Sequence, residues 1–391
     1  MGFLRHAGGT ETGGLGRMLK TATGQSGCLW TSDFDWPFGK PPPTRDYLSS
    51  QGKNSDAMHL LGLNEAPLAP PDRVVEVLQK AAGYLNRYPD NIHTRLTEAV
   101  EQIDGVPVDR QVWGSGAGEL INRAVAIATQ GGLNIVSMSP TFWGYERVYV
   151  LHKARVHRTG LHSDGSMDVD ALLGAIDGTT GIVTFATPGN PSGVSLTEDE
   201  IVHIARSTPD NILLMVDEVY YEFCAHEGGP NALEILRRER TAPWLVLRSF
   251  SKAYRLAGAR VAYGFASDAM TARRIREHSL NFTISSIGFA AALAAFEDRS
   301  ELERYLKHNA AVKMHLIGNL QSIGASPIPS AANFVSARLP VTSVEAANAL
   351  LQWDIVCAGW NHPDFPNNLR IGVGDMASAD AVCEALKGFL A

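Results

Sequence analysis

Short apolar runs typical of buried strands alternate, from residue 60 onward, with amphipathic stretches that have helical spacing. The runs are nearly continuous in valine, isoleucine and leucine, as expected for strands covered on both faces. Strands are predicted at residues 111–113, 134–138, 181–186, 212–216, 244–247 and 261–266. Helices are predicted at residues 119–129, 168–175, 197–205 and 268–278. This alternation requires crossover connections, so it predicts an α/β fold with a mostly parallel sheet sandwiched by helices.

The pattern changes after about residue 286. Two long helices are predicted at 288–296 and 301–323, then a strand pair at 333–338 and 368–373, and a last helix at 378–390. We therefore expect a smaller α+β domain built from both ends of the chain. The predicted organisation is an arm at 1–56, a small domain from 57–75 and 291–391, and a large domain at 76–290.

The first 56 residues differ in composition from the rest. Eight glycines lie among the first thirty residues, and the prolines at 41–43 block helix formation, so we predict a flexible arm. Four aromatic residues are unusual in a free linker and suggest that part of the arm docks on a folded body; they are Trp30, Phe34, Trp36 and Phe38. A disordered leader with incidental aromatics is the alternative.

Composition and charge exclude several classes of protein. With 45% hydrophobic and 19% charged residues in 391, the chain is globular, and 34 basic against 41 acidic residues give a net charge of −7, which excludes a general nucleic-acid coat. No apolar run reaches the roughly 18 residues of a membrane helix, and no signal-peptide core is evident. The four widely spaced cysteines (Cys28, Cys224, Cys357 and Cys383) form no CxxC pair. We therefore predict a cytoplasmic protein without a disulfide framework.

Polar and aromatic signatures follow five successive predicted strands. In order, they read GSGAGE, SPTFWGY, TPGNPSG, DEVYYEF and RSFSKAYRLAGAR. Ligands of open α/β sheets bind beyond the carboxyl ends of the strands, so we expect these segments to share one site. GSGAGE opens a helix and can cradle an anion, although it has neither the lysine of a P-loop nor GxGxxG spacing.

These residues resemble a known family. SFSKAYRLAGARVAYG is similar to the lysine segment of fold-type I pyridoxal-phosphate enzymes. The series LNEAP, NRYPD, GSGAGE, PTFWGY, TPGNPSG and DEVYYEF resembles the histidinol-phosphate aminotransferase branch of the class I/II aminotransferases. The resemblance covers residues 60–390 and implies pyridoxal 5′-phosphate as the cofactor.

The resemblance implies roles around the cofactor for four residues, of which Lys252, Asp217 and Tyr220 would be catalytic. Lys252 would form the Schiff base with the cofactor, which requires a primary amine. Asp217 ends an apolar strand, where a carboxylate is costly unless paired, and the pyridine N–H would pair it; a helix N-cap is the alternative. Tyr220 and Asn190 would hydrogen-bond the phenolic oxygen of the ring, and a cis bond is favoured between Asn190 and Pro191.

The resemblance also assigns the remaining contacts. The cofactor phosphate would be held by Arg260, Ser249, Ser251 and the backbone N–H groups of Ala117 and Gly118. Phe142 would stack on the pyridine ring. Tyr88 would reach the cofactor of a neighbouring subunit, which implies a homodimer with shared sites. On the substrate side, Arg370 would grip the α-carboxylate, with Asn64 and Asn190 beside it.

The predicted activity is transamination between an amino donor and a keto acid acceptor, with no nucleic acid or membrane partner. A lyase, decarboxylase, eliminase or cyclase on the same scaffold is the alternative, and a non-catalytic cofactor-binding regulator is disfavoured. No metal site is predicted. His152, His157 and His162 recur every five residues, and this spacing would not bring them to one face of a helix or of a strand.

One departure from the family bears on the substrate. Histidinol-phosphate aminotransferases carry two arginines in this C-terminal region, and Ala358, in DIVCAGW, stands where the first is expected. We therefore predict that histidinol phosphate is not the substrate. In the alternative, Arg338 or a residue of the arm replaces the missing charge.

Overall fold

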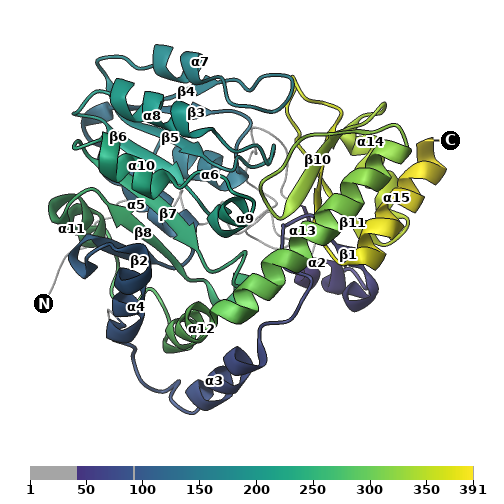
Figure 1. Cartoon of the computed structure of the whole chain (residues 1–391), viewed down its shortest axis with the longest axis horizontal. Helices are drawn as coiled ribbons and strands as arrows, with labels where there is room; N and C mark the ends of the chain where they lie inside the picture. Colours follow the sequence, from purple (N-terminus) through teal and green to yellow (C-terminus); the bar gives the residue numbers. More distant parts are fainter. Residues whose placement is uncertain (1–41, 91–92, 391) are drawn as a thin grey trace, which may run out of the picture. The chain divides into compact units, whose positions relative to one another are not determined.

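A seven-stranded sheet forms the centre of the protein in the computed structural model, which describes residues 42–90 and 93–390 (Figure 1). The strand order is β2-β8-β7-β6-β5-β3-β4. The strands are β2 (Gln111–Gly114), β3 (Asn134–Met138), β4 (Val156–Thr159), β5 (Thr180–Ala186), β6 (Leu213–Asp217), β7 (Trp244–Ser249) and β8 (Ala262–Ala266). The six predicted strands are confirmed, with ends shifted by one or two residues.

The sheet is mostly parallel, as predicted. Strands β4, β3, β5, β6 and β7 pair in parallel, whereas β8 pairs antiparallel with both β7 and β2. The apolar pattern did not predict β4, which lies at one edge of the sheet. Its residues VHRT are half exposed and contain no continuous apolar run, so the pattern used for the inner strands does not detect it.

Helices cover both faces of this sheet, and alternate residues of each strand enter different cores. Val216 of β6 packs in the same core as the helices α8 (Glu198–Ser207) and α10 (Ala232–Glu239). Met215 packs in the other core, with α5 (Ala117–Ala128), α6 (Trp143–Leu151) and α11 (Ala269–Glu277). Successive residues at the carboxyl end of a strand therefore point to opposite faces of the sheet. The remaining helices of this region are α3 (Asp72–Ala82), α4 (Thr94–Asp104), α7 (Val169–Gly174), α9 (Tyr221–His226) and α12 (Ser286–Glu297).

A second group of elements follows α12. The long helix α13 (Arg299–Ser322) leads from α12 to α14 (Ser343–Leu351), α15 (Met376–Leu390) and a four-stranded sheet (Figure 1). That sheet has the order β12-β13-β10-β9, formed by β9 (Ser326–Pro327), β10 (Phe334–Arg338), β12 (Ala358–Gly359) and β13 (Asn368–Gly372). The predicted pairing of the strands at 333–338 and 368–373 is confirmed as β10 and β13, which run antiparallel.

Both ends of the chain contribute to this second group. The strand β1 (His59–Leu60) pairs in parallel with β11 (Ile355–Val356), and Leu61 packs in the core that α13, α14 and α15 share. Within the predicted arm, α2 (Arg45–Ser50) buries Leu48 against Met58 and Val356. The aromatic residues of the arm and Cys28 lie outside the described residues. No helix of the described part of the chain has the length and apolar composition needed to cross a membrane.

Candidate active site

A cavity of about 400 Å³ lies at the carboxyl ends of β5, β6 and β7 and at the start of α5. The structure brings to it every predicted cofactor and substrate residue except Tyr88. These lining residues are Asn64, Ala117, Gly118, Phe142, Asn190, Asp217, Tyr220, Ser249, Ser251, Lys252, Arg260 and Arg370. They come from segments almost 310 residues apart, as expected where parallel strands present their ends to one edge.

Lys252 projects into this cavity from the turn after β7. Its Nζ atom donates to the carbonyl oxygens of Leu63 at 2.8 Å and of Asn64 at 3.0 Å. Burial and the nearby positive charge of Arg370 together lower the pKa of Lys252 to about 7. A substantial fraction of the amine is therefore neutral near pH 7, and the neutral amine is the form that can attack a carbonyl carbon.

Asp217 is the last residue of β6, and its two carboxylate oxygens accept from different elements. The Val219 amide donates to Oδ1 and the Tyr145 hydroxyl of α6 donates to Oδ2, both at 3.0 Å. Burial raises the pKa of Asp217 to about 6 despite these two bonds. A cationic partner in the cavity would stabilise the charged carboxylate.

A hydrogen-bonded chain crosses the substrate side of the cavity. The amide of Asn64 donates to the Tyr220 hydroxyl at 3.0 Å, and that of Asn190 to the same oxygen at 3.5 Å. Arg370 donates to Oδ1 of Asn190 at 2.6 Å and to the Gly62 carbonyl. The peptide bond between Asn190 and Pro191 is cis. Arg370 Nε and Asn64 Oδ1 are buried without a hydrogen-bond partner among the described residues, so both can still bind a ligand.

Another part of the cavity lining is suited to an anion. Ser249 and Ser251 are buried there beside the first turn of α5, whose free N–H groups attract negative charge. The Arg260 side chain lies against Gly116, where a Cβ atom would collide with the guanidinium group. Gly116 also has a φ of 85°, which favours glycine. The sequence analysis noticed the glycine-rich segment but did not assign this contact.

Two more residues were missed. Tyr145 belongs to the motif SPTFWGY, in which no role was predicted for it, and only its hydrogen bond to Asp217 reveals a role in holding that carboxylate. Gly144 lies against Phe142, and a Cβ atom there would collide with the Phe142 ring. The glycine in PTFWGY therefore leaves the space that the ring of Phe142 occupies beside the cavity.

Tyr88 does not line the cavity of its own chain. Its side chain is 84% exposed and stacks on Phe282, with ring centroids 4.9 Å apart. Its predicted role in a neighbouring subunit stays a prediction. Cys224 is buried, as expected for a small apolar residue. Among residues 42–90 and 93–390, no group of three or more histidine, cysteine, aspartate or glutamate side chains is placed to hold a metal ion.

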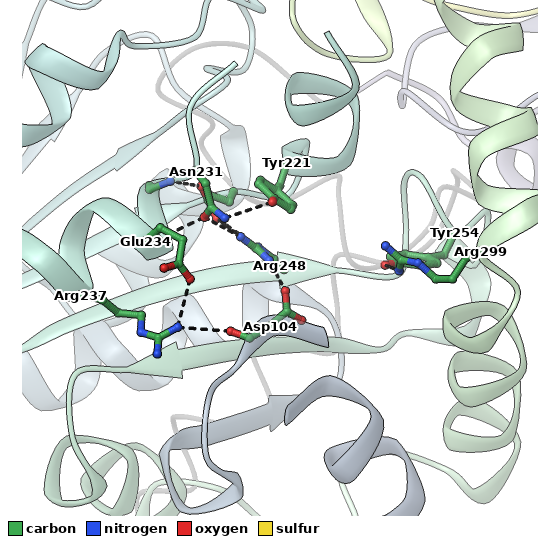
Figure 2. Close-up of polar contacts among 10 residues, drawn as sticks. Asp104, Tyr221, Asn231, Glu234, Arg237, Arg248, Tyr254 and Arg299 are labelled. Carbon is green, nitrogen blue, oxygen red and sulfur yellow. Dashed lines mark hydrogen bonds and ion pairs between the residues drawn. The ribbon is translucent and has the colours of Figure 1, made fainter. Parts of the chain in front are cut away.

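A buried ion-pair cluster lies directly behind these residues and centres on Arg248 (Figure 2). Arg248 and Glu218 adjoin Ser249 and Asp217 in sequence and point to the opposite face of the sheet. Arg248 donates to Glu218 Oε2 at 2.9 and 3.0 Å and to Asp104 Oδ1 at 2.7 Å. Its guanidinium carbon lies 3.5 Å from the centre of the Tyr221 ring. The cluster joins the ends of β6 and β7, the strands that carry Asp217 and Ser249.

Removing this central charge should destabilise the protein. Arg248→Met leaves the carboxylates of Glu218 and Asp104 buried without a cation, and we expect the free energy of unfolding to fall by about 3–5 kcal/mol. Arg240 is a suitable control, because it is also a buried arginine but its hydrogen bonds within the described part of the chain go to carbonyl oxygens, including those of Ala205 and Ile212. Urea unfolding of both methionine variants measures the difference. Equal losses would show that the ion pairs add nothing beyond ordinary hydrogen bonds.

The cavity fits pyridoxal phosphate. It has a primary amine with a lowered pKa, a buried carboxylate that lacks a cationic partner, and an anion-binding end formed by Ser249, Ser251 and Arg260. An aromatic ring, Phe142, also lines the cavity. These four features match the aldehyde, the ring nitrogen, the phosphate and the ring face of that cofactor.

The fold and the cavity together define a fold-type I pyridoxal-phosphate enzyme. Residues 57–386 match the family described as aminotransferase class I and II, and the chain belongs to that family. It is 31% identical over 334 residues to histidinol-phosphate aminotransferase from Bacillus velezensis, which covers 84% of this chain and 91% of the relative. It is 32% identical over 331 residues to the enzyme of the same name from Nitratidesulfovibrio vulgaris strain Hildenborough, covering 84% and 88% of the two chains.

A solved structure agrees with these relatives. Histidinol-phosphate aminotransferase from Sinorhizobium meliloti in complex with pyridoxal-5′-phosphate superposes with a TM-score of 0.81 at 26% identity. The superposition covers 89% of this chain and 95% of that one. The protein is therefore a pyridoxal-phosphate-dependent aminotransferase of class I/II.

Proposed function

We propose that this aminotransferase acts on an unphosphorylated amino acid or a related amine metabolite and not on histidinol phosphate. The observation that carries the proposal is the register of β12 and β13, in which Ala358 is the direct cross-strand partner of Arg370. A methyl group thus occupies the position beside Arg370 where the family resemblance leads us to expect a second guanidinium.

No other cation replaces it among the described lining residues. A second cavity of about 590 Å³ contains Ala358, and Arg370 is the one basic side chain in its described lining. Arg338 is exposed at the end of β10 and lines neither this cavity nor the first. A dianionic phosphate would lack a charge-assisted hydrogen bond worth about 1.5–3 kcal/mol, roughly a ten- to hundredfold loss in affinity.

The side chains of the first cavity have distinct roles in the proposed reaction. Pyridoxal phosphate, when bound, supplies a ring that withdraws electrons from the substrate's Cα atom. Arg370 holds the substrate carboxylate, and Lys252 takes the proton from Cα. Asp217 keeps its negative charge against the ring nitrogen, and Tyr145 holds Asp217 in place. Tyr220 and Asn190 would hold the oxygen on the ring, while Ser249, Ser251 and Arg260 would bind the phosphate.

Steady-state kinetics test the proposed substrate. We expect histidinol phosphate to be turned over with a kcat/KM below about 10⁴ M⁻¹ s⁻¹, at the low end for enzymes acting on their own substrates. Ala358→Arg is the informative variant, because it restores the missing cation and should raise kcat/KM for histidinol phosphate by about tenfold or more. Efficient turnover of histidinol phosphate by the unmodified protein would refute the proposal.

The reaction type has its own test. A single-turnover mixture of an amino acid and the loaded enzyme should yield one keto acid per active site, together with pyridoxamine phosphate. Release of carbon dioxide or of an eliminated group, without pyridoxamine phosphate, would assign the enzyme to another reaction of the same scaffold.

We also propose that the active unit is a homodimer with shared sites. The support is Tyr88, which is exposed on its own chain, together with the exposed apolar side chains of Tyr84, Leu85 and Leu280. Tyr88 stacks on Phe282, which is also exposed, and an exposed pair of rings favours an interface between subunits.

Mixing two defective variants tests this assembly. Lys252→Ala and Tyr88→Phe chains should each be inactive or weakened, but a mixed dimer has one site with both groups intact. After subunit exchange at equal amounts, we expect about one site in four to be complete, and activity measured against unmixed samples should rise accordingly. Full activity of a monomer at high dilution would rule out the shared site.

A further inference from the structure

The second cavity continues from the first, and its lining differs in chemistry. The two cavities share Phe142, Trp143, Asn190 and Arg370. A substrate whose carboxylate binds Arg370 at this junction can therefore place its side chain in the second cavity. This step depends on the proposed function, which assigns the carboxylate to Arg370.

The described lining of the second cavity offers no counter-ion to a charged side chain. The one acidic residue in this described lining, Glu146, is buried and already neutralised by Arg158, whose Nε and Nη2 atoms donate to the two carboxylate oxygens at 3.0 and 2.6 Å. The one basic residue in it, Arg370, is engaged at the junction. Transfer of a charged side chain from water into such a space is costly, so the lining favours a neutral one.

Aromatic rings form part of the wall and are held by their own contacts. Trp360 is 4% exposed, its Nε1 donates to the Ser336 hydroxyl at 3.0 Å, and its ring lies 5.0 Å from that of Phe365. The rings of Phe142 and Trp143 lie 4.8 Å apart. Rings held in this way give flat apolar surfaces before a ligand arrives, and flat surfaces favour stacking with another ring.

Small residues complete the apolar part of the lining and leave the cavity wide. Ala347, Ala358 and Gly359 contribute no side chain beyond a methyl group. A larger residue at position 359 would crowd its neighbours, because a Cβ atom there would lie 2.6 Å from the Ser343 hydroxyl oxygen.

From these features we infer that the amino donor is an α-amino acid with a large, uncharged, ring-bearing side chain, which binds in the second cavity while Arg370 holds its carboxylate. Burying such a ring should favour it over a methyl side chain by about 10- to 100-fold.

Donor and binding measurements on the loaded enzyme test the inference. In single turnovers followed by the visible absorbance of the cofactor, L-phenylalanine and L-tryptophan should react at least tenfold faster than L-alanine and L-glutamate. Without any turnover, 3-phenylpropanoate should bind at least tenfold more tightly than propanoate in a titration of the same absorbance. Equal binding of the two carboxylates, or equal rates with alanine, would overturn the inference and leave the proposed function intact. Efficient reaction with histidinol phosphate would overturn the proposed function instead.

A variant locates the side-chain site. Ala347→Trp fills the second cavity from α14 and should lower the ratio of the phenylalanine rate to the alanine rate by about tenfold or more. Ala349→Trp, two residues along the same helix and absent from the cavity lining, should keep that ratio. An unchanged ratio in Ala347→Trp would place the substrate side chain elsewhere.

Discussion

Lys252→Ala should abolish turnover and the covalent attachment of the cofactor. Loss of the proton transfer alone should reduce kcat by about 10²–10⁴-fold, and loss of the amine that binds the cofactor should reduce it further. Borohydride reduction of the unmodified protein followed by peptide mapping should find the cofactor on Lys252. Recovery of the cofactor on another lysine would contradict the assignment.

Lys313→Ala is a suitable control for this variant. Lys313 is also a buried lysine, but it pairs with Glu227 and donates to the Ser330 carbonyl at 2.7 Å, outside the cavity. We expect that variant to lose stability and to keep the borohydride-fixed cofactor.

The lowered pKa of Lys252 predicts how attachment depends on pH. The pKa of the amine is about 7, so at lower pH the amine is protonated and unreactive, and at higher pH the neutral amine predominates. The rate at which the cofactor-free protein forms the covalent link with added pyridoxal phosphate should therefore rise through about pH 7 and then level off. A rate that continued to rise toward the ordinary lysine value of 10.5 would show that the amine is not desolvated.

The inner strands of the sheet could be predicted because their burial on two faces leaves a readable pattern. The residues directly before Asp217 are all apolar, and the bounds of β6, Leu213–Asp217, agree to within one residue with the strand predicted from them. The same reasoning could not detect β4, which is half exposed, nor the reversed direction of β8, because an apolar run has no direction. Topology of this kind depends on long-range pairing.

Some residues of the candidate site could likewise be predicted from the sequence, and others could not. Lys252, Asp217 and Arg370 could be predicted because their chemistry is specific and each stands at the end of an apolar run or in a distinctive motif. Tyr145 and Arg248 could not, because a tyrosine in an amphipathic helix and an arginine beside a serine have many ordinary roles. Their roles depend on contacts across 72 and 144 residues of sequence, with Asp217 and with Asp104 respectively.

Asp217→Ala should have an effect close to that of losing Lys252, but through another step. The variant removes the negative charge that, in the proposed function, would face the ring nitrogen, and we expect a loss of about 3–5 kcal/mol in transition-state stabilisation, measured from kcat/KM. Cofactor affinity should weaken less, because Ser249, Ser251 and Arg260 remain. A near-normal kcat would show that the ring does not lie against Asp217.

Two conservative variants separate the charge from its support. Asp217→Asn retains the size of the side chain and removes the charge, so it should lose nearly as much activity as Asp217→Ala. Tyr145→Phe removes one hydrogen bond, formed at 3.0 Å, and leaves the charge, so the expected loss is about 1.5–3 kcal/mol. The pH at which the cofactor's absorbance changes should move in both variants. Asp217→Asn removes the charge beside the ring, and Tyr145→Phe removes a hydrogen bond that holds this charge in place. If Tyr145→Phe left that pH unchanged, the tyrosine would be a packing residue and not a support for the carboxylate.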